Sequence, residues 1–257
     1  MKTKAFNWRE FGLLLVAGIL GVIAVLPYTL TLQAPLLENL PIPLAILLPL
    51  QLLQNAVLLA VAVGLGLLLA NRTGLGAPII EGWLAGEQVG PRLRSILTPS
   101  VLWGVIAGVA VTALELLIFA PRLPQAFSQI AQPPAWQGFL ASFYGGIDEE
   151  IFMRLFLMSL LAWLLARLWR TEEGLPTGGA MWTANVATAV IFGLGHLPAT
   201  AVLMPLTPLV IARAILLNSV AGVIFGYLYW KRGLESAMFS HFSADIVLHV
   251  IPPLLVG

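Results

Sequence analysis

Long apolar stretches separated by short polar segments dominate this sequence. Neither the stretch from Phe11 to Leu37 nor that from Asn39 to Asn71 contains an ionisable residue. A helix that crosses the hydrocarbon core of a bilayer needs about 20 mostly apolar residues. The pattern therefore predicts an all-α, polytopic bundle with seven transmembrane spans, at residues 11–31, 43–70, 98–120, 138–169, 180–197, 207–230 and 234–256.

The fourth predicted span is too long for a straight crossing. Residues 138–169 would extend about 48 Å as one α-helix, whereas the hydrocarbon core is about 30 Å thick. Paired glycines weaken a helix, and Gly145 and Gly146 are adjacent. We expect this span to tilt or to break there. An alternative with eight spans splits residues 198–230 at Pro205 and Pro208.

The distribution of basic residues predicts the orientation. With seven spans and a cytoplasmic N-terminus, ten of the 13 Lys and Arg residues fall in cytoplasmic segments and only Arg122 falls outside. Cytoplasmic loops carry such an excess of Lys and Arg. We therefore expect a cytoplasmic N-terminus, a C-terminus outside, and seven spans rather than eight. Lys2, Lys4 and Arg9 precede the first span without a small-residue cleavage site directly after it, which predicts an uncleaved helix.

The composition agrees with a protein of the plasma (inner) membrane. The chain is 59% hydrophobic and 10% charged, with a mean hydropathy of +0.94. A net charge of +1 provides no field for binding nucleic acid, and the absence of cysteine excludes a thiolate nucleophile. The sequence contains no internal repeat, so we expect residues 1–257 to form a single transmembrane domain, with residues 71–97 as its long polar loop.

Several ionisable residues lie inside the predicted spans, where charge is costly and usually serves a function or has a partner. They are Asp148, Glu149, Glu150 and Arg154 in the fourth span, His196 at the end of the fifth, and His241, Asp245 and His249 in the seventh, with Glu115 and Arg213 elsewhere. We expect Glu115 and Arg213 to pair across spans or to line a polar cavity. His249 is expected to pack or to lie at the membrane interface.

Helical spacing separates the roles of the other residues. Glu150 and Arg154 are four residues apart, so they share a face and can form an ion pair. Glu149 points about 100° away from Glu150 and is the candidate general base. His241 and Asp245 are also four residues apart, so one helix face presents an imidazole and a carboxyl group.

Three motifs, each in a different span, resemble those of the CPBP intramembrane proteases, the family of CAAX proteases and bacteriocin-processing enzymes also called Abi. Residues 149–154 (EEIFMR) match its E-E-x-x-x-R motif, residues 192–196 (FGLGH) match F-x-x-x-H, and residues 241–245 (HFSAD) match H-x-x-x-N/D. Gly222 and Gly226 resemble the small-residue helix contact of the family. The resemblance covers about residues 138–250, which it implies are the catalytic core.

The resemblance implies a membrane-embedded endopeptidase in which Glu149 and His196 activate a water molecule. It implies that His241 and Asp245 stabilise the oxyanion, with Glu150 and Arg154 in support. An imidazole N–H can donate to developing negative charge, but an ionised Asp245 would repel it. Asp245 must therefore be protonated, orient the His241 ring through a ring nitrogen, or bind a metal.

A metal-dependent mechanism is the first alternative. Glu149, His196, His241 and Asp245 supply two imidazoles and two carboxylates, a set suited to a divalent metal such as zinc with a retained water. The sequence has no H-E-x-x-H motif, and the mechanism based on glutamate and histidine needs no ion. The substrate is expected to be a peptide or a membrane-anchored protein, prenylated or not.

Other interpretations of these residues remain. Glu150 with Arg154, or His241 with Asp245, would serve as structural pairs in a non-catalytic membrane scaffold. The same carboxylates and histidines would relay protons or bind an ion in a transporter or channel. Depth along ideal helices also separates the candidates, because His241 lies about 10 Å and Glu149 about 30 Å from the cytoplasmic side. A broken fourth span, a buried turn at residues 231–235, or His249 in place of His241 would each remove this mismatch.

Overall fold

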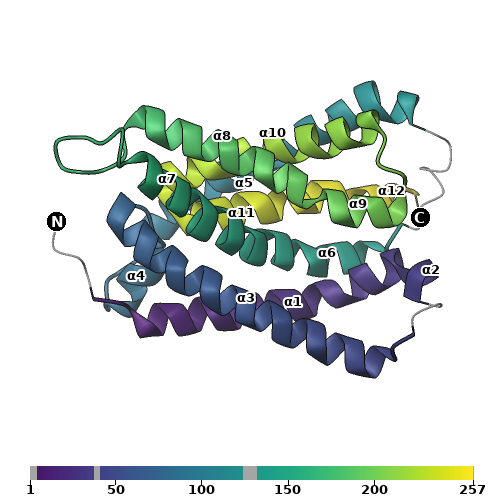
Figure 1. Ribbon diagram of the computed structural model, residues 1–257, viewed down its shortest axis with the longest axis horizontal. Helices are drawn as coiled ribbons and strands as arrows, with labels where there is room; N and C mark the ends of the chain where they lie inside the picture. Colours follow the sequence, from purple (N-terminus) through teal and green to yellow (C-terminus); the bar gives the residue numbers. More distant parts are fainter. Residues whose placement is uncertain (1–4, 38–40, 124–131, 257) are drawn as a thin grey trace.

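The computed structural model describes residues 5–37, 41–123 and 132–256, and all regular secondary structure in these ranges is helical. The long helical elements form seven rods, which lie roughly side by side (Figure 1). Six of them are long and apolar enough to cross a membrane. Lys2 and Lys4, which contribute to the predicted cytoplasmic orientation of the N-terminus, lie outside the described residues.

The rods consist of α-helices, several of which continue as π-helical segments. They are α1 (Trp8–Leu32), α3 (Leu44–Thr73), α5 (Gly90–Leu114) with η1 (Glu115–Phe119) and the 3₁₀ turn η2 (Ala120–Arg122), a fourth rod of α6 (Ala135–Phe143), η4 (Tyr144–Glu149), η5 (Ile151–Met158) and α7 (Ser159–Leu165), then α8 (Gly178–Gly195) with α9 (Leu197–Leu203), α10 (Pro208–Arg232), and α11 (Leu234–Asp245) with η6 (Ile246–Val250) and α12 (Ile251–Val256). Two short helices, α2 (Ala34–Leu37) and α4 (Pro78–Leu84), complete the described structure.

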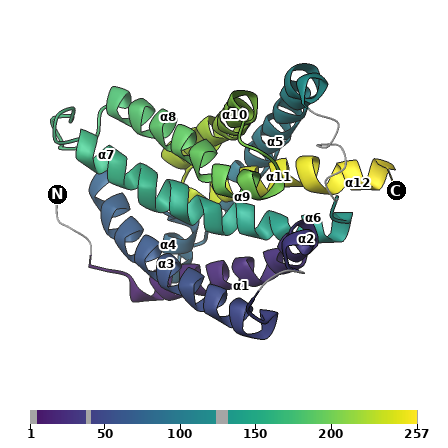
Figure 2. The same ribbon diagram turned by 45° about the vertical axis from the view of Figure 1, so that its right-hand side comes forward.

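The fourth rod crosses the centre of the bundle (Figure 2). It packs against α1 and α3 on one side and against α8 and α11 on the other. The fourth rod carries several charged residues and is not one of the six apolar rods. Three of these residues, Asp148, Glu150 and Arg154, are fully buried. The bundle therefore surrounds its most polar rod with its apolar ones.

The predicted break at Gly145 and Gly146 was wrong, because the fourth rod is continuous from Ala135 to Leu165. Both glycines lie in the π-helical segment η4, and π-turns inside α-helices are frequent at functional sites. A Cβ on Gly145 would collide with Oδ2 of Asp245, and one on Gly146 would lie 3.1 Å from the Cβ of Phe242. The glycines therefore allow α11 to approach the fourth rod closely.

Helix boundaries differ from the predicted ones in two places. Residues 71–97 form less loop than expected, because α3 ends at Thr73, Gly74 caps it with a φ of 72°, and α5 begins at Gly90. The fifth rod continues past His196 to Leu203, so His196 lies within the rod instead of ending it. Since α9 is short and α10 is one helix, residues 198–230 do not form two spans.

Small residues set the contact between α8 and α10. A Cβ on Gly222 would lie 3.0 Å from the Cβ of Ala189, and a Cβ on Gly226 would collide with Oδ1 of Asn185. The Asn185 amide also donates to the carbonyl of Val223 at 3.0 Å. The two helices consequently approach at these glycines, which fixes His196 relative to α10.

The start of α11 is buried beneath α4. Leu234 and Ser236 are fully buried, and the Glu235 carboxylate accepts hydrogen bonds from the amides of Ile79 and Ile80 at 2.9 and 2.8 Å. The helix therefore begins inside the bundle. This burial places His241 deeper than its distance from the end of α11 suggests.

Candidate functional site

Glu149 lies where three rods meet. Its carboxylate lies 3.5 Å from Nε2 of His241 and 4.0 Å from Nε2 of His196. The π-helical segments of the fourth rod and the buried start of α11 together remove the depth mismatch that the sequence suggested. His241, and not His249, lies beside Glu149.

Glu150 points away from Glu149 into the core. One oxygen lies 3.3 Å from Nε of Arg154, as the spacing predicted, and the other accepts a hydrogen bond from Nδ1 of His241 at 2.7 Å. Arg154 also donates to the carbonyl of Gly222 at 3.0 Å, and its guanidinium lies over the rings of Phe192 and Phe225. Glu150 therefore does more than pair with Arg154, because it also orients the His241 ring.

His196 presents a defined nitrogen to Glu149. Its Nδ1 lies 2.8 Å from the carbonyl oxygen of Phe192, and a carbonyl can only accept. Nδ1 therefore carries a proton, and Nε2 faces the Glu149 carboxylate, toward which the neutral form of the ring would present a lone pair. Two acceptors 4.0 Å apart suit a water molecule that donates one O–H to each.

The His241 ring is held on three sides. Glu150 takes Nδ1, the ring stacks on Phe225 at 4.5 Å between centroids, and Nε2 lies 3.7 Å from Oδ1 of Asp245. Asp245 therefore lies beside Nε2, while Glu150 holds Nδ1. Because Nε2 faces the carboxyl groups of both Glu149 and Asp245, at least one of these three groups must carry a proton.

These side chains line a cavity of about 310 Å³. The side chains of His196 and Glu149 are 35% and 22% exposed, so both reach this space. The cavity has polar side chains at Glu149 and at several other positions, with apolar and small residues between them, a setting that can hold ordered water. Its lining includes Tyr28, Ala141, Tyr144, Gly145, Ala199, Leu217, Asn218, Ala221, Ala244, Leu248 and His249.

Several polar residues of the cavity were not identified from the sequence. Tyr28, Tyr144 and Asn218 all line it, and the Tyr28 hydroxyl lies 3.3 Å from Nδ1 of His249. Tyr and Asn inside predicted spans were the available signal, because polar groups in a membrane bundle tend to face a cavity or a partner. His249 packs against Tyr28 at the cavity wall.

Asp148, Glu115 and Arg213 do not line the cavity. Nε of Arg213 donates to Glu115 at 2.7 Å, so these residues pair across spans as expected. Asp148 is fully buried, and neither of its carboxyl oxygens has a hydrogen-bond partner among the described residues. It fills the space beside Gly18 and Gly21 of α1, since a Cβ on Gly21 would collide with Asp148.

Glu149, His196, His241 and Asp245 are the candidate donors for a metal ion. Within the described ranges, no group of three or more His, Asp or Glu side chains is arranged to hold a metal ion. The contacts from Nε2 of His241 to Glu149 and Asp245 are 3.5 and 3.7 Å. Sensitivity of peptide cleavage to a chelator tests the metal-dependent mechanism.

Gly145→Ala should disrupt the site at one point. Its Cβ would collide with Asp245 and lie 3.1 Å from Nε2 of His241, so α11 must shift away from Glu149. We expect about a 10²-fold loss of peptide cleavage and a loss of about 1–3 kcal/mol in stability. Gly12→Ala is the matched control, because nothing lies within 4 Å of its Cβ. Equal cleavage by both variants would contradict the close approach of α11.

One protein-family model matches this chain. Residues 131–247 match the family model described as Type II CAAX prenyl endopeptidase Rce1-like. The matched range contains all three motifs. No curated protein and no solved structure matches the chain.

Proposed function

We propose that this chain, which belongs to the CPBP family of CAAX proteases, is a membrane-embedded endopeptidase. In this proposal Glu149 and His196 activate a water molecule that hydrolyses a peptide bond. The observation that carries the proposal is the convergence of Glu149, His196 and His241 from three rods at one cavity.

The first step is the attack of water on the peptide carbonyl. A water molecule between Glu149 and His196 donates one proton to a base as its oxygen bonds to the carbonyl carbon. The carboxylate of Glu149 is the candidate base, while the contact from Nδ1 of His196 to the carbonyl of Phe192 keeps Nε2 of that ring turned toward the water. His196 holds the second O–H of the water in place.

The second requirement is stabilisation of the oxyanion. Nε2 of His241, when protonated, donates toward the developing charge, and Glu150 holds the ring in this orientation through Nδ1. Asp245 lies 3.7 Å from the same nitrogen. The proton taken by Glu149 then passes to the leaving amine, which completes hydrolysis.

Cleavage assays of the purified chain in proteoliposomes test this function. The probes are a farnesylated peptide with a CAAX terminus and an unprenylated membrane-bound peptide, each assayed with and without EDTA. We expect wild-type cleavage of at least one peptide, insensitivity to EDTA, and a loss of about 10²-fold or more in His196→Ala.

Three results would contradict the proposal. Equal cleavage by the wild type and His196→Ala would remove His196 from the mechanism. Loss of activity in EDTA, with recovery on added zinc, would replace water activation by Glu149 with activation by a metal. Cleavage of neither peptide by the wild type would oppose the peptidase assignment.

A further inference from the structure

The cavity occupies one half of the bundle. On α1 and α9 it is lined by residues near their ends, among them Gln33 and Ala199, and on α11 and η6 by residues from His241 to His249. Helices α1, α8 and α11 run in the same direction, from the end where α4 lies toward the end where α12 lies (Figure 1). The cavity therefore extends from Glu149 in the middle toward the α12 end.

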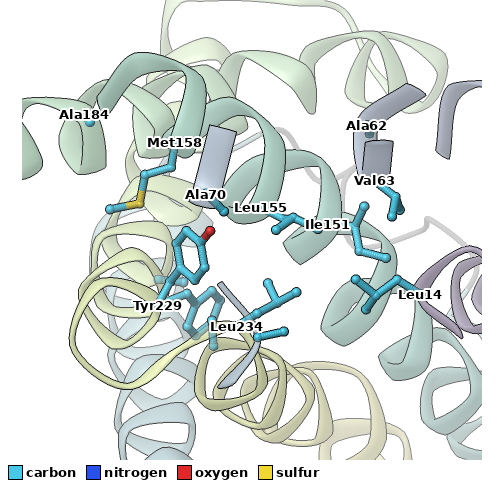
Figure 3. Close-up of a cluster of buried hydrophobic side chains, with 14 of the residues drawn as sticks. Leu14, Ala62, Val63, Ala70, Ile151, Leu155, Met158, Ala184, Tyr229 and Leu234 are labelled. Atoms are coloured by element: carbon cyan, nitrogen blue, oxygen red, sulfur yellow. The ribbon is translucent and has the colours of Figure 1, made fainter. Parts of the chain in front are cut away.

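The opposite half is closed by packed side chains. Glu150, Arg154 and Met158 are fully buried and Tyr229 is 1% exposed. The hydroxyl groups of Ser159 and Tyr229 are hydrogen-bonded at 2.9 Å. Figure 3 shows Met158, Leu155 and Tyr229 gathered in this region. Two other cavities lie at this end, but of these residues only Tyr229 lines one of them, and neither cavity is lined by Glu149.

The basic residues mark the closed end. Most of the described Lys and Arg residues lie there, at the ends of rods or in the segments that join them: Arg9, Arg72, Arg92, Arg94, Arg167, Arg170, Lys231 and Arg232. At the α12 end, η2 carries Arg122, the one base that the described residues place there. The remaining two lie within rods, where Arg154 pairs with Glu150 and Arg213 pairs with Glu115 of another rod. An excess of Lys and Arg marks the cytoplasmic side of a membrane protein.

We infer that the cavity opens toward the non-cytoplasmic side of the membrane, so that its substrate is a peptide segment presented from that side. The inference rests on the proposed function in calling the bound segment a substrate. The direction in which the cavity opens rests on packing and charge alone. A tail held at the cytoplasmic surface would meet the closed end. A segment of a membrane protein near the non-cytoplasmic surface would enter beside Gln33 and Ala199 and reach Glu149.

Thiol labelling in intact cells tests the direction of opening. The chain contains no cysteine, so a single introduced cysteine is the only reactive thiol. Ala199→Cys places it in the cavity wall, and Glu173→Cys places it in the exposed segment between α7 and α8 at the basic end. A membrane-impermeant maleimide should label Ala199→Cys in intact cells and Glu173→Cys only after permeabilisation.

The reverse labelling pattern would overturn the inference. Failure of Ala199→Cys to react under both conditions, with reaction restored in SDS, would also overturn it, because the cavity would then hold no accessible water. Neither result depends on cleavage. Failure of the inference is therefore distinguishable from failure of the peptidase assignment, which the proteoliposome assay measures.

Discussion

Glu149→Gln is expected to lower kcat/KM for peptide hydrolysis by about 10²–10⁴-fold, the usual contribution of a general base. Glutamine keeps the size of the side chain and can still bind water, but its amide cannot take a proton from it. Glu149 is 22% exposed in the cavity and lies at 3.5 and 4.0 Å from the two histidines, so the substitution should leave the packing of the core unchanged.

The matched control for this prediction is Glu173→Gln, which makes the same change in an exposed segment far from the cavity. Both proteins should unfold at the temperature of the wild type, while only Glu149→Gln loses cleavage. Wild-type rates in Glu149→Gln would mean that another group accepts the proton. An equal loss in Glu173→Gln would mean that the assay responds to something other than the site.

Arg154→Met is expected to have the largest effect on folding. Arg154 and Glu150 are both fully buried, and Glu150 would be left as a buried carboxylate without its cation. Removing one partner of a buried ion pair costs about 3–5 kcal/mol. Thermal unfolding in detergent measures the loss. Cleavage should fall as well, since Glu150 also orients His241.

A second variant separates the ion pair from general disruption of the core. Glu150→Gln combined with Arg154→Met removes both charges, so the double variant should recover part of the stability lost in Arg154→Met. Arg213→Met provides a control in the other embedded pair, whose side chains are 22% and 18% exposed and should contribute less. Losses that simply add in the double variant would contradict the coupling of Glu150 and Arg154.

The sequence predicted those features that depend on local periodicity. Hydropathy located the seven rods, and a spacing of four residues predicted the Glu150 to Arg154 contact. Hydropathy did not predict that α5 begins at Gly90. Arg92 and Arg94 lie near the start of this helix, so its apolar stretch begins later than the helix itself.

The periodicity of apolar residues could not predict the geometry of the site. The bond from His241 to Glu150 joins residues 91 positions apart, and the contact between His241 and Glu149 depends on π-turns in the fourth rod and on the burial of Leu234 beneath α4. Neither feature changes the count of apolar residues along the chain. Gly145 was detected but interpreted as a break, because its close approach to Asp245 appears only when the rods are packed.

The claim that Glu149 and His196 act on one water molecule is tested most directly by a double-variant cycle. Cleavage rates of the wild type, Glu149→Gln, His196→Ala and the double variant are measured on the same peptide in the same proteoliposomes. Groups that act as a unit give non-additive losses, so the double variant should be no slower than the more impaired single variant. Losses that multiply in the double variant would show that the two side chains act independently and would contradict the shared water.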